Sequence, residues 1–553
     1  MARRLARDRR RAFLAATAAV GATALFAPGA QAADFTVTTD SDSAMGSLRD
    51  AITSANAAPN SSPTTPDTIS FDTSAFADDT ITLTAGQIPI TESVTITGPG
   101  QSAVKVSGND ASRIFDVTGL NTSTTVVSVS ALTLMHGHAV GSAAAGAGGA
   151  IRTDQYSDLT LTDAAVSSNA ADTSGGGIQA VGPLTVTNST LSGNTATDGA
   201  GGAINYAADN ANLKIAGSAF SGNHAHSNGG AVNAGGGSVV TGTTFTSNEA
   251  QGGVGGAISS FGALTLTGSS LTGNTASLSG GGVYAGTDYG GLVAEGSTIS
   301  GNTATSALGG GGGVAVNEGS GKYAARNRLS HTVVSGNHAT GGDGGGVLVG
   351  GLGADDRMNV VQSTISGNDA GSSGGGISFR GNSPASLKGE LALTDATVSG
   401  NTAATGGGVG VGTPHENPVL GPHGTIAFDN STIAANSATS AGGGIFFAQY
   451  DSTDAAPVKK SATVAATSTI VGDNLLNGSG QDADRIDSST SGGLDLAFSL
   501  VENPSGDSIA AQSADRPSIT GSDPLLGPLT DNGGQTLTQL PSLASPAIDQ
   551  GFA

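Results

Sequence analysis

A short cassette that recurs every 25 to 36 residues constrains the fold of this chain more than any other feature. The motif Gly-Gly-(Ala/Gly)-(Ile/Val) occurs eleven times between Gly148 and Ile445, and an apolar-x-x-Asn turn alternates with it. The asparagines of that turn are Asn169, Asn194, Asn223, Asn248, Asn274, Asn302, Asn337, Asn368, Asn401 and Asn436, with Asp473 in the eleventh repeat. Fixed columns at such a period are typical of a solenoid.

The columns also define a core. Counted from each Asn, the third residue upstream is always apolar: Val166, Leu191, Phe220, Phe245, Leu271, Ile299, Val334, Ile365, Val398, Ile433 and Ile470. Apolar and polar residues alternate on either side, which predicts short strands. Equivalent positions of successive repeats should therefore stack at about 4.8 Å. We expect an all-β, right-handed parallel β-helix with three strands per coil, about twelve or more coils and a cap at each end.

The corners of the expected coil explain the glycines and asparagines. Glycine can adopt a positive φ or allow close backbone approach. Asparagine tolerates a left-handed turn and can bond its counterpart one coil away, so the ten asparagines above should form a structural ladder. An α-helical fold is excluded because a 3.6-residue period is absent and so much glycine would destabilise helices. A sandwich is excluded because the same cassette keeps recurring.

Four segments follow from these patterns. Residues 1–32 form a signal peptide, with several arginines, an apolar run from Phe13 to Phe26 and a small-residue cleavage site at Ala30-Gln31-Ala32. The pair Arg10-Arg11 fits twin-arginine export, and an ordinary secretory signal is the alternative. Residues 33–130 contain the N-terminal cap and first coils, residues 131–480 the regular repeats, and residues 481–553 the terminal coils and a C-terminal cap. No apolar stretch after the signal is long enough to span a membrane.

Composition limits the partners of the chain. It has 43 acidic and 21 basic residues, a net charge of −22 and no cysteine. This charge disfavours nucleic acid and anionic membranes. Without disulfides, stability must come from stacking.

The repeats resemble those of polymorphic outer-membrane-type proteins, literally so at Phe220-x-x-Asn223 and Phe245-x-x-Asn248. The segment from Gly46 to Ile52 resembles the start of secreted right-handed β-helix proteins. The tail from Asp523 to Asp549 resembles the choice-of-anchor Q region of bacterial surface β-helix proteins. These resemblances imply a pectin-lyase-like fold and an extracellular or cell-surface location. They do not imply a particular reaction.

The later repeats are longer, and their extra residues fall at one corner of the coil. Loops stacked at one corner of a solenoid often form its binding face, although drift in tolerant loops is the alternative. The candidates for a binding face are Tyr323, Arg326, Arg380, His415, Glu416, Tyr450 and Asp451.

Catalysis is the weaker hypothesis. Asp355, Asp356 and Arg357 offer acids beside a base, as a polysaccharide lyase or hydrolase needs, but solvated loops often carry such residues. His136 with His138, and His224 with His226, lie about three coils apart and should be polar turn residues, so no metal site is predicted. The acidic surface could still associate loosely with Ca²⁺.

The sequence thus favours an exported, non-catalytic, adhesin-like protein that presents a binding face to an extracellular ligand, such as a polysaccharide or a host or envelope surface. The alternative is a carbohydrate-active enzyme, a lyase or hydrolase acting on acidic polysaccharide.

Overall fold

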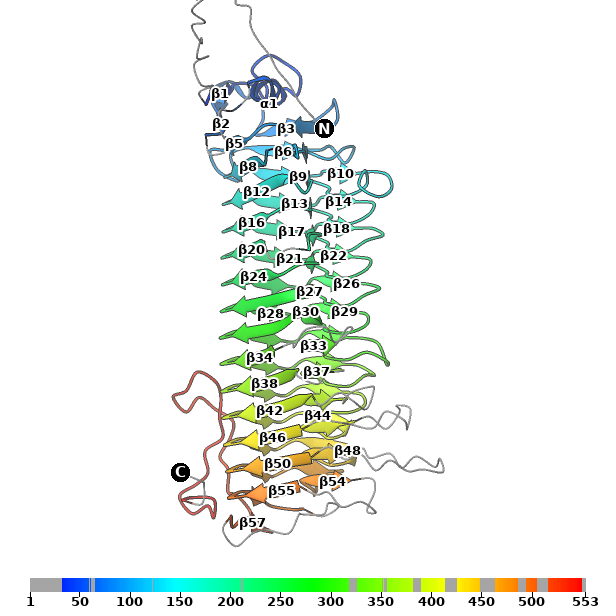
Figure 1. Ribbon diagram of the computed structural model, residues 1–553, viewed down its shortest axis with the longest axis vertical. Helices are drawn as coiled ribbons and strands as arrows, with labels where there is room; N and C mark the ends of the chain where they lie inside the picture. Colours follow the sequence, from blue (N-terminus) through cyan, green and yellow to red (C-terminus); the bar gives the residue numbers. More distant parts are fainter. Residues whose placement is uncertain are drawn as a thin grey trace, which may run out of the picture.

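A computed structural model describes residues 32–58, 60, 65–121, 123–209, 212–317, 326–350, 352, 356–380, 389–412, 425–447, 463–485, 494–504 and 516–549. The chain is a right-handed parallel β-helix, an elongated rod of stacked coils (Figure 1). Its strands form three long sheets of 28, 16 and 13 strands. Sixteen layers at the usual strand spacing make a rod about 70 Å long. The fold predicted from the repeats is confirmed.

One coil shows how a cassette folds. The Gly-Gly motif leads into a first strand, β15 (Ile178–Ala180), and a short corner leads to a second strand, β16 (Leu184–Thr187). Both belong to the 28-stranded sheet. The third strand, β17 (Thr190–Ser192), joins the 16-stranded sheet, and the two-residue β18 (Thr195–Ala196) joins the 13-stranded sheet. In β27 (Ile258–Thr267) the first and second strands merge into one.

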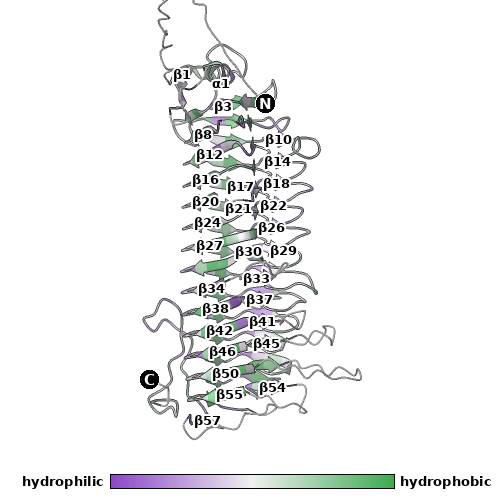
Figure 2. Cartoon of the chain, in the orientation of Figure 1, coloured by the Kyte–Doolittle hydropathy of each residue, from purple (hydrophilic) through white to green (hydrophobic). Residues whose placement is uncertain are grey.

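The predicted core column is directly stacked. Val166, Leu191, Phe220, Phe245 and Leu271 pair in register from coil to coil, and each is at most 1% exposed. A single hydrophobic cluster extends from Val37 to Val501. Hydrophobic segments accordingly recur along the stack between β8 (Thr125–Ser130) and β55 (Leu494–Ala497) (Figure 2).

The corner glycines have two different tasks. Gly175 has a φ of +69°, in the left-handed region that disfavours side chains. A Cβ on the next residue, Gly176, would lie 2.3 Å from the carbonyl oxygen of Gly202 in the following coil. The recurring Gly-Gly pair therefore combines a turn with a close contact between coils.

The asparagines lie inside the rod and form a one-way hydrogen-bond ladder. Asn194 Nδ2 donates to Asn223 Oδ1 at 2.9 Å and to the carbonyl oxygen of Val166. The same pattern runs from Asn169 to Asn436. The expectation that Asn itself takes the left-handed turn was wrong, because the positive φ belongs to the preceding residue, such as Gly193 at +61°.

The eleventh repeat is displaced by one residue from its expected alignment. Asn436 Nδ2 donates to Asn474 Oδ1, so Asn474 and not Asp473 continues the ladder. Val471, and not Ile470, pairs with Ile433 and is fully buried. Asp473 takes the left-handed corner, with a φ of +58°.

The N-terminal end of the rod carries the helix α1 (Leu48–Ala57) (Figure 1). Its cap is reciprocal: Ser47 Oγ accepts from the backbone N–H of Asp50, and Asp50 Oδ2 accepts from Gly46 N. Leu48, Ile52 and two alanines of the helix are buried in the core cluster. The helix thereby covers apolar side chains at the end of the stack.

The C-terminal tail differs from the expected end cap. After β57 (Ile519–Thr520), the chain turns back along the side of the rod (Figure 1) and contacts β39 (Thr364–Ser366) of the 16-stranded sheet. Thr364 Oγ1 donates to the carbonyl oxygen of Leu537 at 2.6 Å, although the two residues are 173 positions apart. The tail therefore lies beside coils that precede it by well over a hundred residues.

Candidate functional site

A column of polar side chains faces outward from successive first strands. It begins with Asp116 on β7 (Phe115–Val117) and continues with Arg152 on β11 (Ile151–Thr153), Gln179 on β15, Asn205 on β19 (Ile204–Tyr206) and Asn233 on β23 (Val232–Ala234). Their chain neighbours point into the core. Asp116, Gln179 and Asn205 are nevertheless only 8–9% exposed, because loops stand on both sides of the column. We call this column and its flanking loops the first-strand groove.

The groove begins at a charged pair. Arg152 donates from Nε to Asp116 Oδ1 at 2.7 Å and from Nη2 to Asp116 Oδ2 at 2.9 Å. Gln87 Nε2 donates to the same carboxylate at 3.0 Å. A two-pronged contact of this kind fixes the plane of the guanidinium group. The negative charge of Asp116 therefore neutralises Arg152.

A second arginine holds one wall of the groove. Arg113 is buried and donates to the carbonyl oxygens of Ala145 and Ala147 at 2.6 and 2.8 Å. Arg152 Nη1 donates to the carbonyl oxygen of Ala144 at 3.0 Å. Burial lowers the pKa of Arg113 to about 10, so it stays charged at neutral pH. Arg113 and Arg152 thus both hold the loop before β11 through hydrogen bonds to its carbonyl oxygens.

Amide side chains continue the floor. Asn205 Nδ2 donates to Gln179 Oε1, and Asn233 Nδ2 donates to Asn205 Oδ1, both at 2.8 Å. Among the described residues, Gln179 Nε2 has no hydrogen-bond partner, nor have the buried Asn233 Oδ1 and the Ser259 Oγ that follows in the next coil. Both oxygens are shielded from solvent, whereas the free Gln179 Nε2 is a donor that the floor offers to a ligand.

The groove contains a cavity of about 530 Å³. Its floor is formed by Arg152, Gln179 and Asn205. Its remaining lining comes from the loops and strand ends on both sides: Ala143, Ala144, Ala147, Thr153, Asp154, Thr173, Ser174 and Val181. A cavity of this size is in the range of small-ligand sites.

Of the three candidate catalytic residues, the structure describes two. Asp356 is 2% exposed, whereas Arg357 starts β38 (Arg357–Val361), lies on the surface and pairs with Glu390 at 3.1 Å. Asp355 lies outside the described residues. The described part of this trio does not bring an exposed carboxylate and a free base together, because adjacent residues entering a strand point to opposite sides.

The expected binding face is described only in part. Arg380 pairs with the buried Asp343 at 2.9 Å, and it also donates to the carbonyl oxygen of Gly309. Arg326 begins β34 (Arg326–Ser330), but its side chain lies outside the described residues. Tyr323, His415, Glu416, Tyr450 and Asp451 lie outside the described residues altogether.

The histidines face carboxylates of neighbouring coils. His136 lies 3.2 Å from Asp110, and His138 lies 3.0 Å from Asp172. His224 lies 3.3 Å from Glu249. These acids come from other coils of the stack, so the local sequence around each histidine does not show them.

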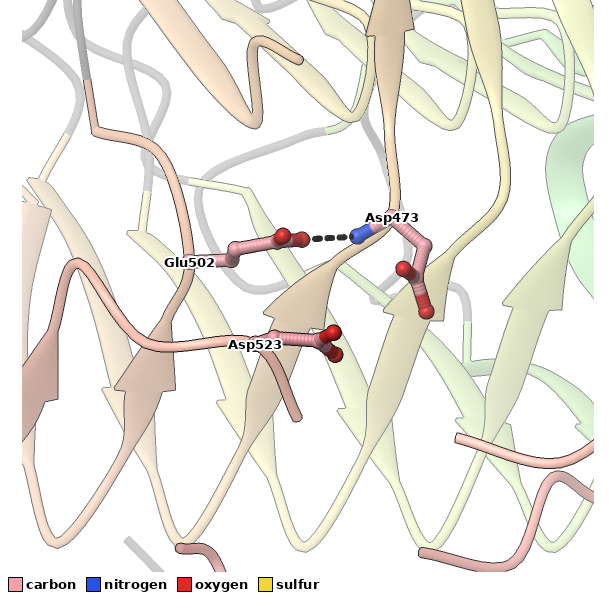
Figure 3. Close-up of side chains that lie close together, drawn as sticks. All are labelled: Asp473, Glu502 and Asp523. Atoms are coloured by element: carbon pink, nitrogen blue, oxygen red, sulfur yellow. Dashed lines mark hydrogen bonds between the residues drawn. The ribbon is translucent and has the colours of Figure 1, made fainter. Parts of the chain in front are cut away.

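Three carboxylates meet where the tail passes the last coils. Asp473, Glu502 and Asp523 each place an oxygen within 4.8 Å of the others (Figure 3). Glu502 Oε2 accepts from the backbone N–H of Asp473 at 2.6 Å. Partial burial and the two neighbouring acids raise the pKa of Asp473. We call these residues the acidic cluster. The carboxylate of Asp523 in the tail and those of Asp473 and Glu502 in the last coils repel one another.

The sequence analysis missed Arg152, Gln179 and Asn205. Each directly follows the Gly-Gly-(Ala/Gly)-(Ile/Val) motif. Alignment on that motif, and not only on the Asn turn, would have shown a run of polar residues at one outward position in the first repeats.

No protein-family model and no curated protein matches this sequence. Similar solved structures include tailspike protein 3 of bacteriophage CBA120, which is 12% identical with a TM-score of 0.38 over 81% of this chain. This chain spans 59% of the length of that tailspike chain. The A-module of mannuronan C-5 epimerase AlgE4 from Azotobacter vinelandii is 11% identical with a TM-score of 0.30, over 88% of this chain and 100% of that one. The function of the chain must be argued from its own residues.

The part of the chain that the structure describes holds no helix with the length and hydrophobicity that crossing a bilayer requires.

Proposed function

We propose that this chain is an exported, non-catalytic β-helix protein of the cell surface or extracellular space that binds a polysaccharide along its first-strand groove. The observation that carries the proposal is the polar column itself. Five successive coils present a polar side chain at the same outward position, and loops enclose that column from both sides.

A repeating site favours a repeating ligand. Adjacent coils place their outward side chains about 4.8 Å apart along the rod. Amides such as Gln179 and Asn205 can donate to one hydroxyl and accept from another, which suits sugars. The strands of the floor already pair with neighbours on both sides, so an added peptide strand would find no free edge there. The net charge of −22 disfavours nucleic acid.

The described part of the chain gives less support to catalysis. A lyase or hydrolase needs a carboxylate and a base that both reach the substrate. The burial of Asp356 and the pairing of Arg357 with Glu390 speak against the candidate trio. In the groove, Asp116 is held by Arg152, which suits a fixed binding surface better than a group that exchanges protons.

The cell-surface location rests on sequence features. These are the expected signal peptide and the resemblance of the repeats and tail to those of polymorphic outer-membrane-type and choice-of-anchor Q proteins. In the later coils the connections between first and second strands are longer, as between β33 (Val314–Asn317) and β34.

A glycan panel tests the proposal. The purified chain without its signal peptide should bind at least one polysaccharide and release no oligosaccharide from it. An Asn205→Ala, Asn233→Ala double variant should bind more weakly, and Thr185→Ala, on the outer side of β16, should bind normally. Absence of binding across neutral and acidic polysaccharides would refute the proposal, and released oligosaccharide would favour the enzyme instead.

A further inference from the structure

We infer that the cavity over Arg152, Gln179 and Asn205 is a subsite for an uncharged sugar residue of the bound chain. This inference rests on the proposed function and adds the class of sugar and its place. The cavity of about 530 Å³ can enclose one or two sugar rings.

The free hydrogen-bonding groups of the cavity suit hydroxyls. Arg152 uses three of its N–H groups on Asp116 and on the carbonyl oxygen of Ala144, so two of the five in a guanidinium remain. Gln179 is 8% exposed, and its Nε2 has no partner in the described part of the chain. Among the lining residues, Ser174 Oγ accepts from a backbone N–H group and keeps its own hydroxyl proton to donate.

The charges at the cavity are balanced within the protein. Arg152 is neutralised by Asp116. Asp154 accepts from the backbone N–H groups of Gly119 and Tyr156 and from Ser157 Oγ. The buried Arg113 donates to carbonyl oxygens of the wall and also lies 3.9 Å from Asp116. A sugar carboxylate would find no unpaired cation here and would have to compete with Asp116.

The rest of the lining is apolar and small. Ala143, Ala144, Ala147 and Val181 surround the polar floor. These methyl groups can contact the C–H face of a sugar ring, which aromatic side chains often cover in other sites. The chain has no tryptophan, so these small apolar side chains would contact the sugar ring in place of an aromatic side chain.

Two substitutions at position 179 distinguish a loss of sugar binding from a loss of folding. Gln179→Ala removes the free amide donor. Gln179→Glu keeps an oxygen that can accept from Asn205 and places a carboxylate where the donor was. Thr185→Ala, in the next strand of the same coil, is the matched control, since Thr185 also faces outward and is half-buried. Circular dichroism checks that each variant is folded.

Calorimetric titration with hexasaccharides measures the binding affinity of each variant. The probes are cello-, xylo- and mannohexaose as neutral sugars and hexagalacturonate and hexamannuronate as acidic ones. At least one neutral probe should bind about tenfold more tightly than either acidic probe. Both Gln179 variants should weaken that binding about tenfold, which corresponds to about 1.4 kcal/mol, and Thr185→Ala should not change it.

The outcomes distinguish the two proposals. Tighter binding of an acidic probe would overturn the inference and leave the proposed function intact. So would neutral binding that Gln179→Ala and Gln179→Glu leave unchanged, because the sugar would then lie elsewhere. Failure of every hexasaccharide and every polysaccharide to bind would overturn both.

Discussion

The rings of Phe220 and Phe245 stack with centroids 4.8 Å apart and planes inclined by 16°, although 25 residues separate them in the chain. That distance is the spacing of neighbouring strands in a sheet. The two side chains occupy the same position in consecutive cassettes, and their strands pair in register. One sequence repeat therefore forms one coil, and successive coils lie one strand spacing apart.

Phe245→Ala should strongly destabilise the rod. Phe245 is fully buried, and the substitution would leave a cavity between Phe220 and Leu271. We expect a loss of about 3–5 kcal/mol in the free energy of unfolding, measured by urea denaturation. Thr246→Ala, on the exposed side of the same strand, is the control. Equal losses in the two variants would contradict the stacked core.

Asn223→Ala should interrupt the ladder. The backbone N–H and one Nδ2 proton of Asn194 would lose Asn223 Oδ1 as their acceptor inside the rod. Buried donors without partners are costly, so we expect a loss of about 3 kcal/mol. Hydrogen exchange should locate the effect: protection should fall at residues 194 and 223 more than at the distant Asn401. A uniform change along the rod would contradict a local ladder defect.

Asp482 should make the last coils more stable at lower pH. It ends the ladder, accepts from Asn474 Nδ2 at 2.9 Å and from Asn503 N at 2.6 Å, and is 1% exposed. Burial raises its pKa to about 6, above the ordinary value of 3.8. Because the folded pKa is the higher one, ionisation disfavours folding, and this penalty is complete above pH 6 and fades as the pH falls toward 4.

Urea denaturation of the wild type and Asp482→Asn from pH 7 to pH 5 measures this effect. The wild type should gain on the order of 1 kcal/mol relative to the variant over that range. The comparison cancels the other carboxylates, which titrate in both proteins. A constant difference between the two proteins would show that Asp482 does not titrate there.

Thr364→Val should loosen the tail without unfolding the rod. The substitution removes the hydroxyl that donates to the carbonyl oxygen of Leu537 and preserves the shape of the side chain. Limited proteolysis should cut residues 521–549 faster, while the urea midpoint of the rod stays within error. Thr397→Val, also buried on the 16-stranded sheet, is the comparison. Unchanged cleavage in Thr364→Val would show that this contact does not hold the tail.

The regular part of the rod was predictable because the side chains at certain fixed positions of every cassette must enter a narrow core. The side chains of Val166, Leu191 and Phe220 differ in shape, but all three are apolar and occupy the equivalent position of successive cassettes. The prediction failed at Ile470 and Asp473, where a corner is displaced by one residue. The Asn column of the sequence cannot reveal which of two adjacent polar residues turns inward, and the structure assigns that place to Asn474.

The candidate site was harder to predict, since residues that face outward need not be apolar. Gln179, Asn205 and Asn233 are polar, but the same position holds Ala315 and Leu348 in later coils. Arg152 meets Asp116 across 36 residues, a distance that no local pattern encodes. The tail contact between Thr364 and Leu537 was missed for the same reason.

A crystal structure of the chain with a bound neutral hexasaccharide is the most direct test of the groove. We predict sugar rings along the outward side of the column from Asp116 to Asn233, with one ring in the cavity beside Gln179. Sugar bound on the outer face of the 16-stranded sheet, with the column free, would contradict the assignment of the binding face.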